Sequence, residues 1–195
     1  DPALPDPDIQ LFFVVGLVDD HMRRLRFADG FTTHVCLLRP ESRGSLGLAG
    51  SDPRLPPRID PGFLTDARDL EGLCRGVRIL ERILTTEPLA PWTGAALYPR
   101  EPGDAALKAD IRARADTAYH PVGTCRMGRD ALAVVTPDLR VRGLEGLRVV
   151  DASVMPKLVG GNTNAPTLMI AERAAAMIRG QAGPRSRLRA LEEAR

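Results

Sequence analysis

The sequence is poor in the residues that build disulfide and metal sites. Its three cysteines are Cys36, Cys74 and Cys125, and none of them belongs to a C-x-x-C pair. Their odd number and wide separation argue against a disulfide framework and against a zinc site, and a reducing compartment fits them best. We therefore expect a cytoplasmic location and no bound metal.

Long apolar runs and an excess of charge of one sign are also missing. No stretch approaches the ~20 apolar residues that a helix needs to cross a bilayer, and the first residues lack the pattern of a secretion signal. The 27 basic and 25 acidic residues leave a formal net charge of +2. Such a weak field does not indicate nucleic acid or an anionic membrane as a partner, so we expect a small molecule.

Aromatic residues are few, but apolar residues are not. They make up 4% and 44% of the chain respectively, over a length of 195 residues. This is enough apolar material for one good-sized core or for two small lobes, so composition gives no reason to expect disorder.

The first part of the chain has the pattern of strands. Runs of apolar and β-branched residues predict strands over residues 9–18, 31–38 and 45–48. Prolines then punctuate residues 51–61, which makes a regular helix or central strand implausible there. We expect an extended loop that joins sheet to helix.

Helices are expected next. Thr65 is placed to cap a helix that runs to about residue 83, where leucine, valine and isoleucine recur at spacings of three and four. A second helix is expected over residues 104–117, and a last one over residues 165–179. Between these two helices, apolar alternation predicts strands within residues 134–150.

One histidine is placed to do chemistry. His120 stands in the run Ala-Tyr-His-Pro-Val-Gly-Thr-Cys-Arg-Met-Gly, after a helix and directly before Pro121. The proline disfavours helical backbone at His120, so the imidazole projects from a loop of fixed direction. With an ordinary histidine pKa of ~6.5, such a side chain can accept a proton near neutral pH. From the residues alone, a structural role is the more common one.

Two further segments have the composition of ligand-binding backbone. Asp151 and Ala152 end a predicted strand, where small residues let a ligand approach closely; an ordinary turn at a strand end explains them as well. Farther on, a Gly-Asn-rich loop enters the last helix, whose amino terminus attracts negative charge. Asn162 or Asn164 could simply cap that helix, which leaves the other asparagine to spare.

Together these runs resemble a known family. His-Pro-Val-Gly-Thr-Cys-Arg-Met-Gly, Val-Thr-Pro-Asp-Leu-Arg-Val, Asp-Ala-Ser-Val-Met-Pro, Gly-Asn-Thr-Asn-Ala-Pro-Thr and Ala-Glu-Arg-Ala-Ala occur here in the order and spacing of glucose-methanol-choline oxidoreductases, particularly the choline-dehydrogenase-like branch. The similarity extends upstream through residues 39–45 and 57–61 and covers most of residues 9–180. Five motifs in register make coincidence an unsatisfactory explanation.

The resemblance implies an α+β fold in two parts. Residues 1–133 would belong to a substrate-binding domain, with a mixed or antiparallel sheet and flanking helices. Residues 134–180 would be the C-terminal strand and helix of a Rossmann-like FAD domain, and residues 181–195 an arginine-rich tail. The family's G-x-G-x-x-G fingerprint is absent from this sequence, so we expect a missing N-terminal segment or chain to supply the nucleotide site.

The resemblance also assigns roles to residues. His120 falls on the family's catalytic histidine and Asn164 on its partner. The remaining matches are cofactor-binding positions, namely Asp151, Ala152, Asn162, Thr163, Pro166 and Thr167. Pro166 and Thr167 would open the helix that is aimed at the pyrimidine side of the flavin.

The implied function is oxidation of a primary alcohol to an aldehyde by hydride transfer to FAD. His120 would take the hydroxyl proton, and Asn164 would hydrogen-bond the substrate oxygen as negative charge develops on it. Cys125 has no orienting acid nearby in the sequence, so we interpret it as a packing residue rather than a nucleophile. The alternative is a non-catalytic fragment that acts only as an interaction or structural module.

Overall fold

The computed structural model describes residues 4–20, 24 and 26–180, and the chain forms two compact units, Asp1–Ala118 and Tyr119–Arg195. The expected tail over residues 181–195 lies outside the described residues. The expected boundary at residue 133 is a different one: it separates the parts that would belong to the substrate-binding and FAD domains of a complete enzyme. That boundary stays a prediction.

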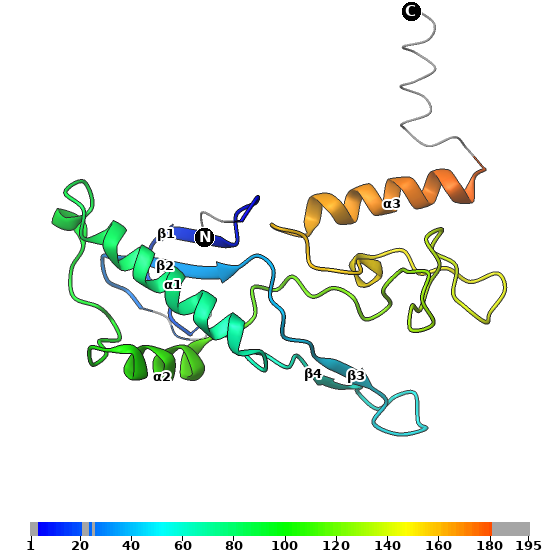
Figure 1. Cartoon of the computed structure of the whole chain (residues 1–195), viewed down its shortest axis with the longest axis horizontal. Helices are drawn as coiled ribbons and strands as arrows, with labels where there is room; N and C mark the ends of the chain where they lie inside the picture. The colour runs from blue at the N-terminus through cyan, green and yellow to red at the C-terminus, as the bar shows by residue number, and fades with distance from the viewer. Residues whose placement is uncertain (1–3, 21–23, 25, 181–195) are drawn as a thin grey trace, which may run out of the picture. The chain divides into compact units, whose positions relative to one another are not determined.

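The first unit contains an antiparallel pair of strands covered by a helix (Figure 1). Strand β1 (Ile9–Val15) pairs with β2 (Phe31–Leu37), as the apolar runs predicted, with slightly shorter bounds. Helix α1 (Ala67–Leu84) packs on this pair through Gly76, where a Cβ would come within 2.3 Å of Val35 Cγ1. A side chain at that position would push the helix off the sheet.

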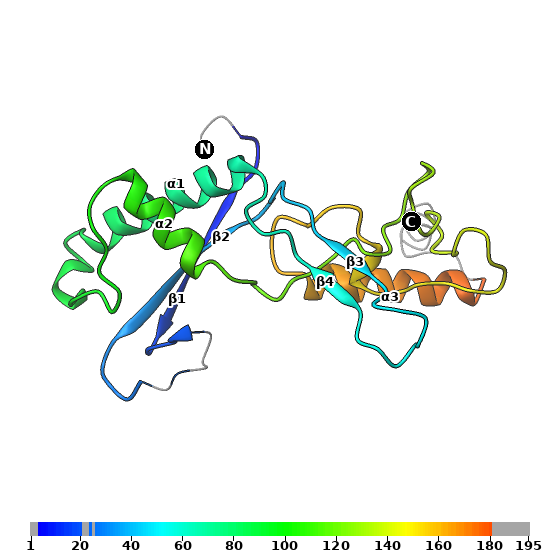
Figure 2. The same ribbon diagram turned by 90° about the horizontal axis from the view of Figure 1, so that it is seen from below.

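The expected loop over residues 51–61 contains a short strand. Strand β4 (Arg58–Asp60) pairs antiparallel with β3 (Ser45–Gly47), and the two form a hairpin at one end of the first unit (Figure 2). The prediction of an unpaired loop was therefore wrong for three residues. Pro57 and Pro61 flank the strand rather than interrupt it, so each backbone N–H within it remains able to pair.

The cap of α1 also differs from the prediction. The side chain of Asp66, and not that of Thr65, accepts a hydrogen bond from the first turn, from the N–H of Arg68 at 2.9 Å. Thr65 instead donates its hydroxyl to the carbonyl of Gly62 at 2.9 Å. A carboxylate is the better partner for the positive end of a helix, so Asp66 occupies the capping position.

Helix α2 (Asp104–Arg114) ends three residues before the expected bound, and Ala115 is already extended. Its buried residues Leu107 and Ile111 pack with Leu70 and Cys74 of α1. A 3-10 turn, η2 (Ala90–Trp92), lies in the connection between the two helices.

The second unit is built of loops around one helix. The 3-10 turn η3 (Ala152–Val154) and helix α3 (Asn164–Ile178) pack together, and α3 agrees with the predicted helix to within one residue at each end. Its core is formed by six buried residues from all parts of the unit, namely Val135, Leu139, Val154, Met155, Ile170 and Ala174.

The strands expected within residues 134–150 form only isolated bridges. Val135 bridges to Met127 and to Val141, and Arg140 bridges to Arg148. The chain reverses direction every few residues there, which leaves no ladder long enough to count as a strand. The described part of the chain is thus α+β with small antiparallel sheets, and the Rossmann-like assignment of the second unit stays a prediction.

Within residues 4–20, 24 and 26–180, no helix has the length and the apolar character required to cross a membrane.

Candidate active site

Two residues of the predicted site are in direct contact. The hydroxyl oxygen of Thr163 lies 3.1 Å from Nδ1 of His120, although the two are 43 residues apart in the sequence. His120 is half-buried on irregular backbone, and Thr163 is buried at the amino terminus of α3. The fold therefore brings the His120 loop and the Gly-Asn-rich loop together, while the predicted pairing of His120 with Asn164 stays a prediction. Asn164 follows Thr163 directly and is exposed.

The loop that carries His120 turns sharply at two positions. Tyr119 and Gly123 adopt left-handed backbone, with φ of 60° and 92°, so the chain turns sharply on either side of His120 and Pro121. Two residues farther on, Cys125 donates its N–H to the carbonyl of Ser153 at 3.0 Å.

Two more backbone hydrogen bonds hold the following residues of the loop. Met127 donates its N–H to the carbonyl of Val154 at 2.8 Å, and Gly128 donates to the carbonyl of Val135 at 3.1 Å. The His120 loop is thereby attached both to η3 and to the core of the second unit. Its backbone is held before any ligand binds.

An ion pair closes the far end of the same loop. The guanidinium of Arg126 donates two hydrogen bonds to the carboxylate of Asp130, at 2.9 and 2.6 Å. This pairing holds the pKa of Asp130 well below its usual range. The sequence interpretation did not identify the pair. Its signal was weak, because opposite charges four residues apart are expected to meet on a helix, and residues 126–130 are not helical.

Helix α3 presents its amino terminus to the same site. Thr163 is the N-cap residue, so neither Asn162 nor Asn164 caps the helix, contrary to the simple alternative. Pro166 stands in the first turn, where its missing N–H costs nothing. Thr167 donates both its N–H, at 3.0 Å, and its hydroxyl, at 2.6 Å, to the carbonyl of Thr163.

The Asp151 segment is a turn rather than a strand end. Asp151 is exposed and caps η3, with its carboxylate accepting from the N–H of Ser153 at 2.7 Å. Ala152 packs against the core of the second unit. The ordinary-turn explanation describes this geometry, and the assignment of both residues to a cofactor stays a prediction.

The donor set fits one end of FAD. The amino terminus of α3 offers backbone N–H groups and the positive end of the helix dipole, and the exposed amides of Asn162 and Asn164 lie beside it. These groups suit a flavin ring, which carries negative charge when reduced. They do not form a pyrophosphate site, since the chain has no G-x-G-x-x-G turn.

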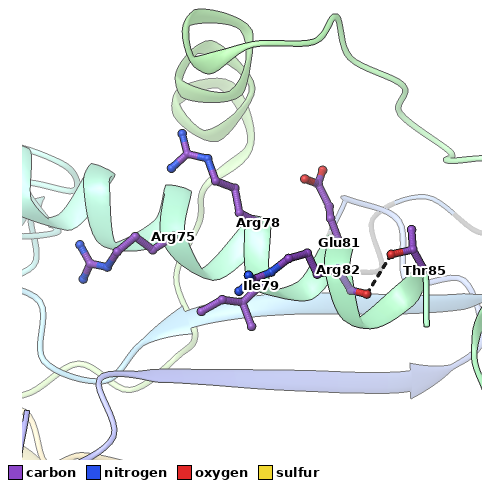
Figure 3. A pocket seen from close by; sticks show the side chains of 6 residues that line it. All are labelled: Arg75, Arg78, Ile79, Glu81, Arg82 and Thr85. Carbon is purple, nitrogen blue, oxygen red and sulfur yellow. Dashed lines mark hydrogen bonds between the residues drawn. The ribbon is translucent and has the colours of Figure 1, made fainter. Parts of the chain in front are cut away.

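A shallow depression in the first unit is a poor candidate for a second site. Five side chains of α1 and that of its C-cap residue line it, namely Arg75, Arg78, Ile79, Glu81, Arg82 and Thr85 (Figure 3). Arg75 and Arg78 already pair with Asp8 and Asp104, and Glu81 pairs with Arg100. In the described part of the chain, no group of three or more His, Cys, Asp and Glu residues could hold a metal ion.

The family model described as GMC oxidoreductase matches residues 40–171, and it represents the C-terminal part of these enzymes. The chain belongs to the GMC oxidoreductase family. The match covers both the first helix of the chain and the His120 and Asn164 motifs. Curated GMC relatives extend the similarity over most of the chain. An alcohol dehydrogenase [acceptor] from Pseudomonas putida is 46% identical over 91% of the chain, and human mitochondrial choline dehydrogenase is 45% identical over 92%.

Solved GMC structures share this fold. Pyridoxine 4-oxidase from Mesorbium loti superposes with a TM-score of 0.81 at 35% identity, over 91% of this chain and 35% of that one. A formate oxidase variant from Aspergillus oryzae RIB40, made to examine the effect of a mutation on FAD modification, superposes with a TM-score of 0.85 at 29% identity, over 91% of this chain and 32% of that one. The chain covers 32% of the Pseudomonas relative and 31% of the human one, so it spans about a third of the length of these curated GMC enzymes.

Proposed function

We propose that this chain supplies the catalytic histidine of an FAD-dependent oxidoreductase that converts a primary alcohol to an aldehyde. The observation that supports this most strongly is the contact between His120 and Thr163, because it unites a potential proton acceptor with the amino terminus of α3. Family membership supports the use of FAD, and the two curated relatives are an alcohol and a choline dehydrogenase.

FAD would supply a hydride acceptor at flavin N5, and this chain's residues would supply the proton chemistry and the positioning. His120 takes the hydroxyl proton of the alcohol at Nε2, because Nδ1 is engaged with Thr163. Asn164 donates an amide N–H to the same substrate oxygen as it gains negative charge, which lowers the energy of the transition state.

Cofactor contacts are proposed for the segments around this pair. Asp151 and Ala152 would approach the flavin through the backbone of η3, and Asn162 and Thr163 through the loop before α3. Pro166 and Thr167 begin the helix, whose dipole would stabilise negative charge on the pyrimidine side of the ring.

A further protein segment would complete the enzyme. Helix α3 exposes Leu168 and Met169, at 60% and 59%, while Ile170 on its inner face is 7% exposed. A helix with apolar side chains on both faces is typical of a buried position, which supports a second layer of protein over α3. We propose an N-terminal FAD-binding segment or chain for that layer, with the enzyme in the cytoplasm.

The test begins with flavin-loaded protein in which this chain is completed by its FAD-binding segment. Mixed anaerobically with choline and with a series of simple primary alcohols, it should lose the absorbance of oxidised flavin and yield one aldehyde per flavin. Reduction by no primary alcohol, with reduction by another class of donor, would remove the alcohol assignment. A protein that folds and binds a partner but never acquires FAD would favour the alternative, a non-catalytic interaction module.

A further inference from the structure

Thr163 is an N-cap residue whose hydroxyl does not cap the helix. An N-cap threonine usually accepts a hydrogen bond from the N–H of the second or third helical residue. In α3 the third residue is Pro166, which has no N–H, and the side chain of Thr163 makes no capping bond to the second residue, Ala165, either. The hydroxyl lies instead 3.1 Å from Nδ1 of His120.

Thr163 is also held firmly in place. It is 9% exposed, and its carbonyl accepts two hydrogen bonds from Thr167, one from the N–H and one from the hydroxyl. These bonds fix the backbone of Thr163, and its β-branched side chain has few rotamers, so the position of Oγ1 is restricted, one residue before Asn164.

We infer that Thr163 is a positioning residue that orients the imidazole of His120 and accepts from its Nδ1–H in the tautomer that proton acceptance requires. The Nδ1–H of the neutral imidazole donates to Oγ1 of Thr163, which leaves the lone pair on Nε2 and aims it away from α3. In the opposite tautomer the Thr163 hydroxyl would donate to a bare Nδ1, and Nε2 would carry the proton and have no lone pair for a substrate proton, so proton acceptance by His120 requires the first arrangement. This inference rests on the proposed role of His120 as the proton acceptor.

The same hydrogen bond continues to act after proton transfer. When Nε2 takes the substrate proton, the imidazole becomes a cation and its Nδ1–H remains directed at Oγ1. Hydrogen bonds from a charged donor are shorter and stronger than those from a neutral one, so the contact stabilises the product of proton transfer more than the starting state. A hydroxyl that merely filled space would not do this.

The tautomer can be observed directly and without flavin. The chain has three histidines, so ¹⁵N-imidazole NMR signals can be assigned to His120 by their loss in a His120→Gln variant. At a pH where the ring is neutral, the wild-type protein should show a protonated Nδ1 and an unprotonated Nε2. Thr163→Val, which keeps the shape but removes the oxygen, should shift the signals toward the other tautomer, and Thr163→Ser should restore them. If Thr163→Val does not fold, Thr163→Ala provides the same comparison.

The rate of flavin reduction then tests whether the hydrogen bond between Thr163 and His120 affects proton transfer. In flavin-loaded protein, Thr163→Val should slow flavin reduction by about 5- to 10-fold, the size that one hydrogen bond supports, and Thr163→Ser should restore most of the rate. A protonated Nε2 in the wild type, or a Thr163→Val variant with unchanged signals and rate, would overturn the inference. The proposed function fails by a separate result, namely wild-type flavin reduction in His120→Gln.

Discussion

The N–H of Met127 donates to the carbonyl of Val154 at 2.8 Å, which joins the loop that follows His120 to the turn that follows Asp151. These two segments, which are 27 residues apart in the sequence at this bond, are thus packed together in the second unit. Preorganisation of this kind is what proton transfer requires, because the acceptor must already be in place when the substrate arrives. The site is therefore sensitive to changes in the loop backbone, and not only to changes in His120.

Replacement of Gly123 by alanine tests that backbone. Gly123 has φ of 92°, and a Cβ there would lie 3.5 Å from the carbonyl oxygen of Met155, which is ordinary contact. The cost is thus conformational, and we expect Gly123→Ala to lower the free energy of unfolding by about 1–3 kcal/mol. Gly94→Ala is the matched control, since nothing lies within 4 Å of its Cβ position. Urea unfolding of both variants measures the difference, and equal values would show that the loop has no such constraint.

The two faces of α3 should respond differently to truncation. Ile170 is 7% exposed and packs in the core of the second unit, so Ile170→Ala should cost about 2–5 kcal/mol of stability in the chain. Leu168 is 60% exposed, and Leu168→Ala should change the stability of the chain by less than about 0.5 kcal/mol. Denaturant titrations compare the two variants. A larger loss for Leu168→Ala than for Ile170→Ala would mean that α3 faces the core by its other side.

Acid should weaken the first unit through Asp19. This buried carboxylate accepts hydrogen bonds from the hydroxyl of Tyr98 and from Nε of Arg26, and these bonds hold its pKa below the ordinary value of 3.8. Its folded pKa is the lower one, so its contribution to stability is complete above pH 3.8 and is lost as the pH falls through the folded pKa. Thermal unfolding of Asp19→Asn should therefore depend less steeply on pH below about pH 4 than that of the wild type. Parallel curves for the two proteins would show that Asp19 does not contribute.

The asparagines of the loop before α3 should separate binding from chemistry. Asn164→Ala should slow flavin reduction by about 100-fold in protein that still holds flavin, because one hydrogen-bond donor to the developing alkoxide is lost. Asn162→Ala should instead weaken flavin retention and leave the reduction rate of the loaded protein near normal. Stopped-flow reduction and flavin content after gel filtration give the two readings. The reverse pattern would exchange the two roles.

Sequence alone predicted the elements that local pattern dictates. Strands β1 and β2 follow from apolar, β-branched runs, and α1 and α3 from helical spacing with Pro166 and Gly180 at the ends of α3. The bridges within residues 134–150 were mistaken for strands, because alternation indicates which side chains face the core but not whether the backbones pair.

The sequence predicted which two loops form the site, but not which side chains are in contact there. Motifs indicated that His120 and the loop before α3 act together, and the structure brings them into contact. The contact itself is made by Thr163, and not by Asn164, and only coordinates could show it. Pro166 removes one of the two N–H groups that a capping threonine can bind, but the N–H of Ala165 remains, so the direction of the Thr163 side chain is a matter of the three-dimensional fit of one helix end.

The central claim is that His120 accepts the proton of an alcohol while flavin accepts the hydride. Stopped-flow measurement of flavin reduction in flavin-loaded His120→Ala tests it most directly, with Cys125→Ala as the control for a nearby side chain that we place outside the chemistry. We predict a loss of at least ~100-fold for His120→Ala and a near-normal rate for Cys125→Ala. A near-normal rate for His120→Ala would contradict the account.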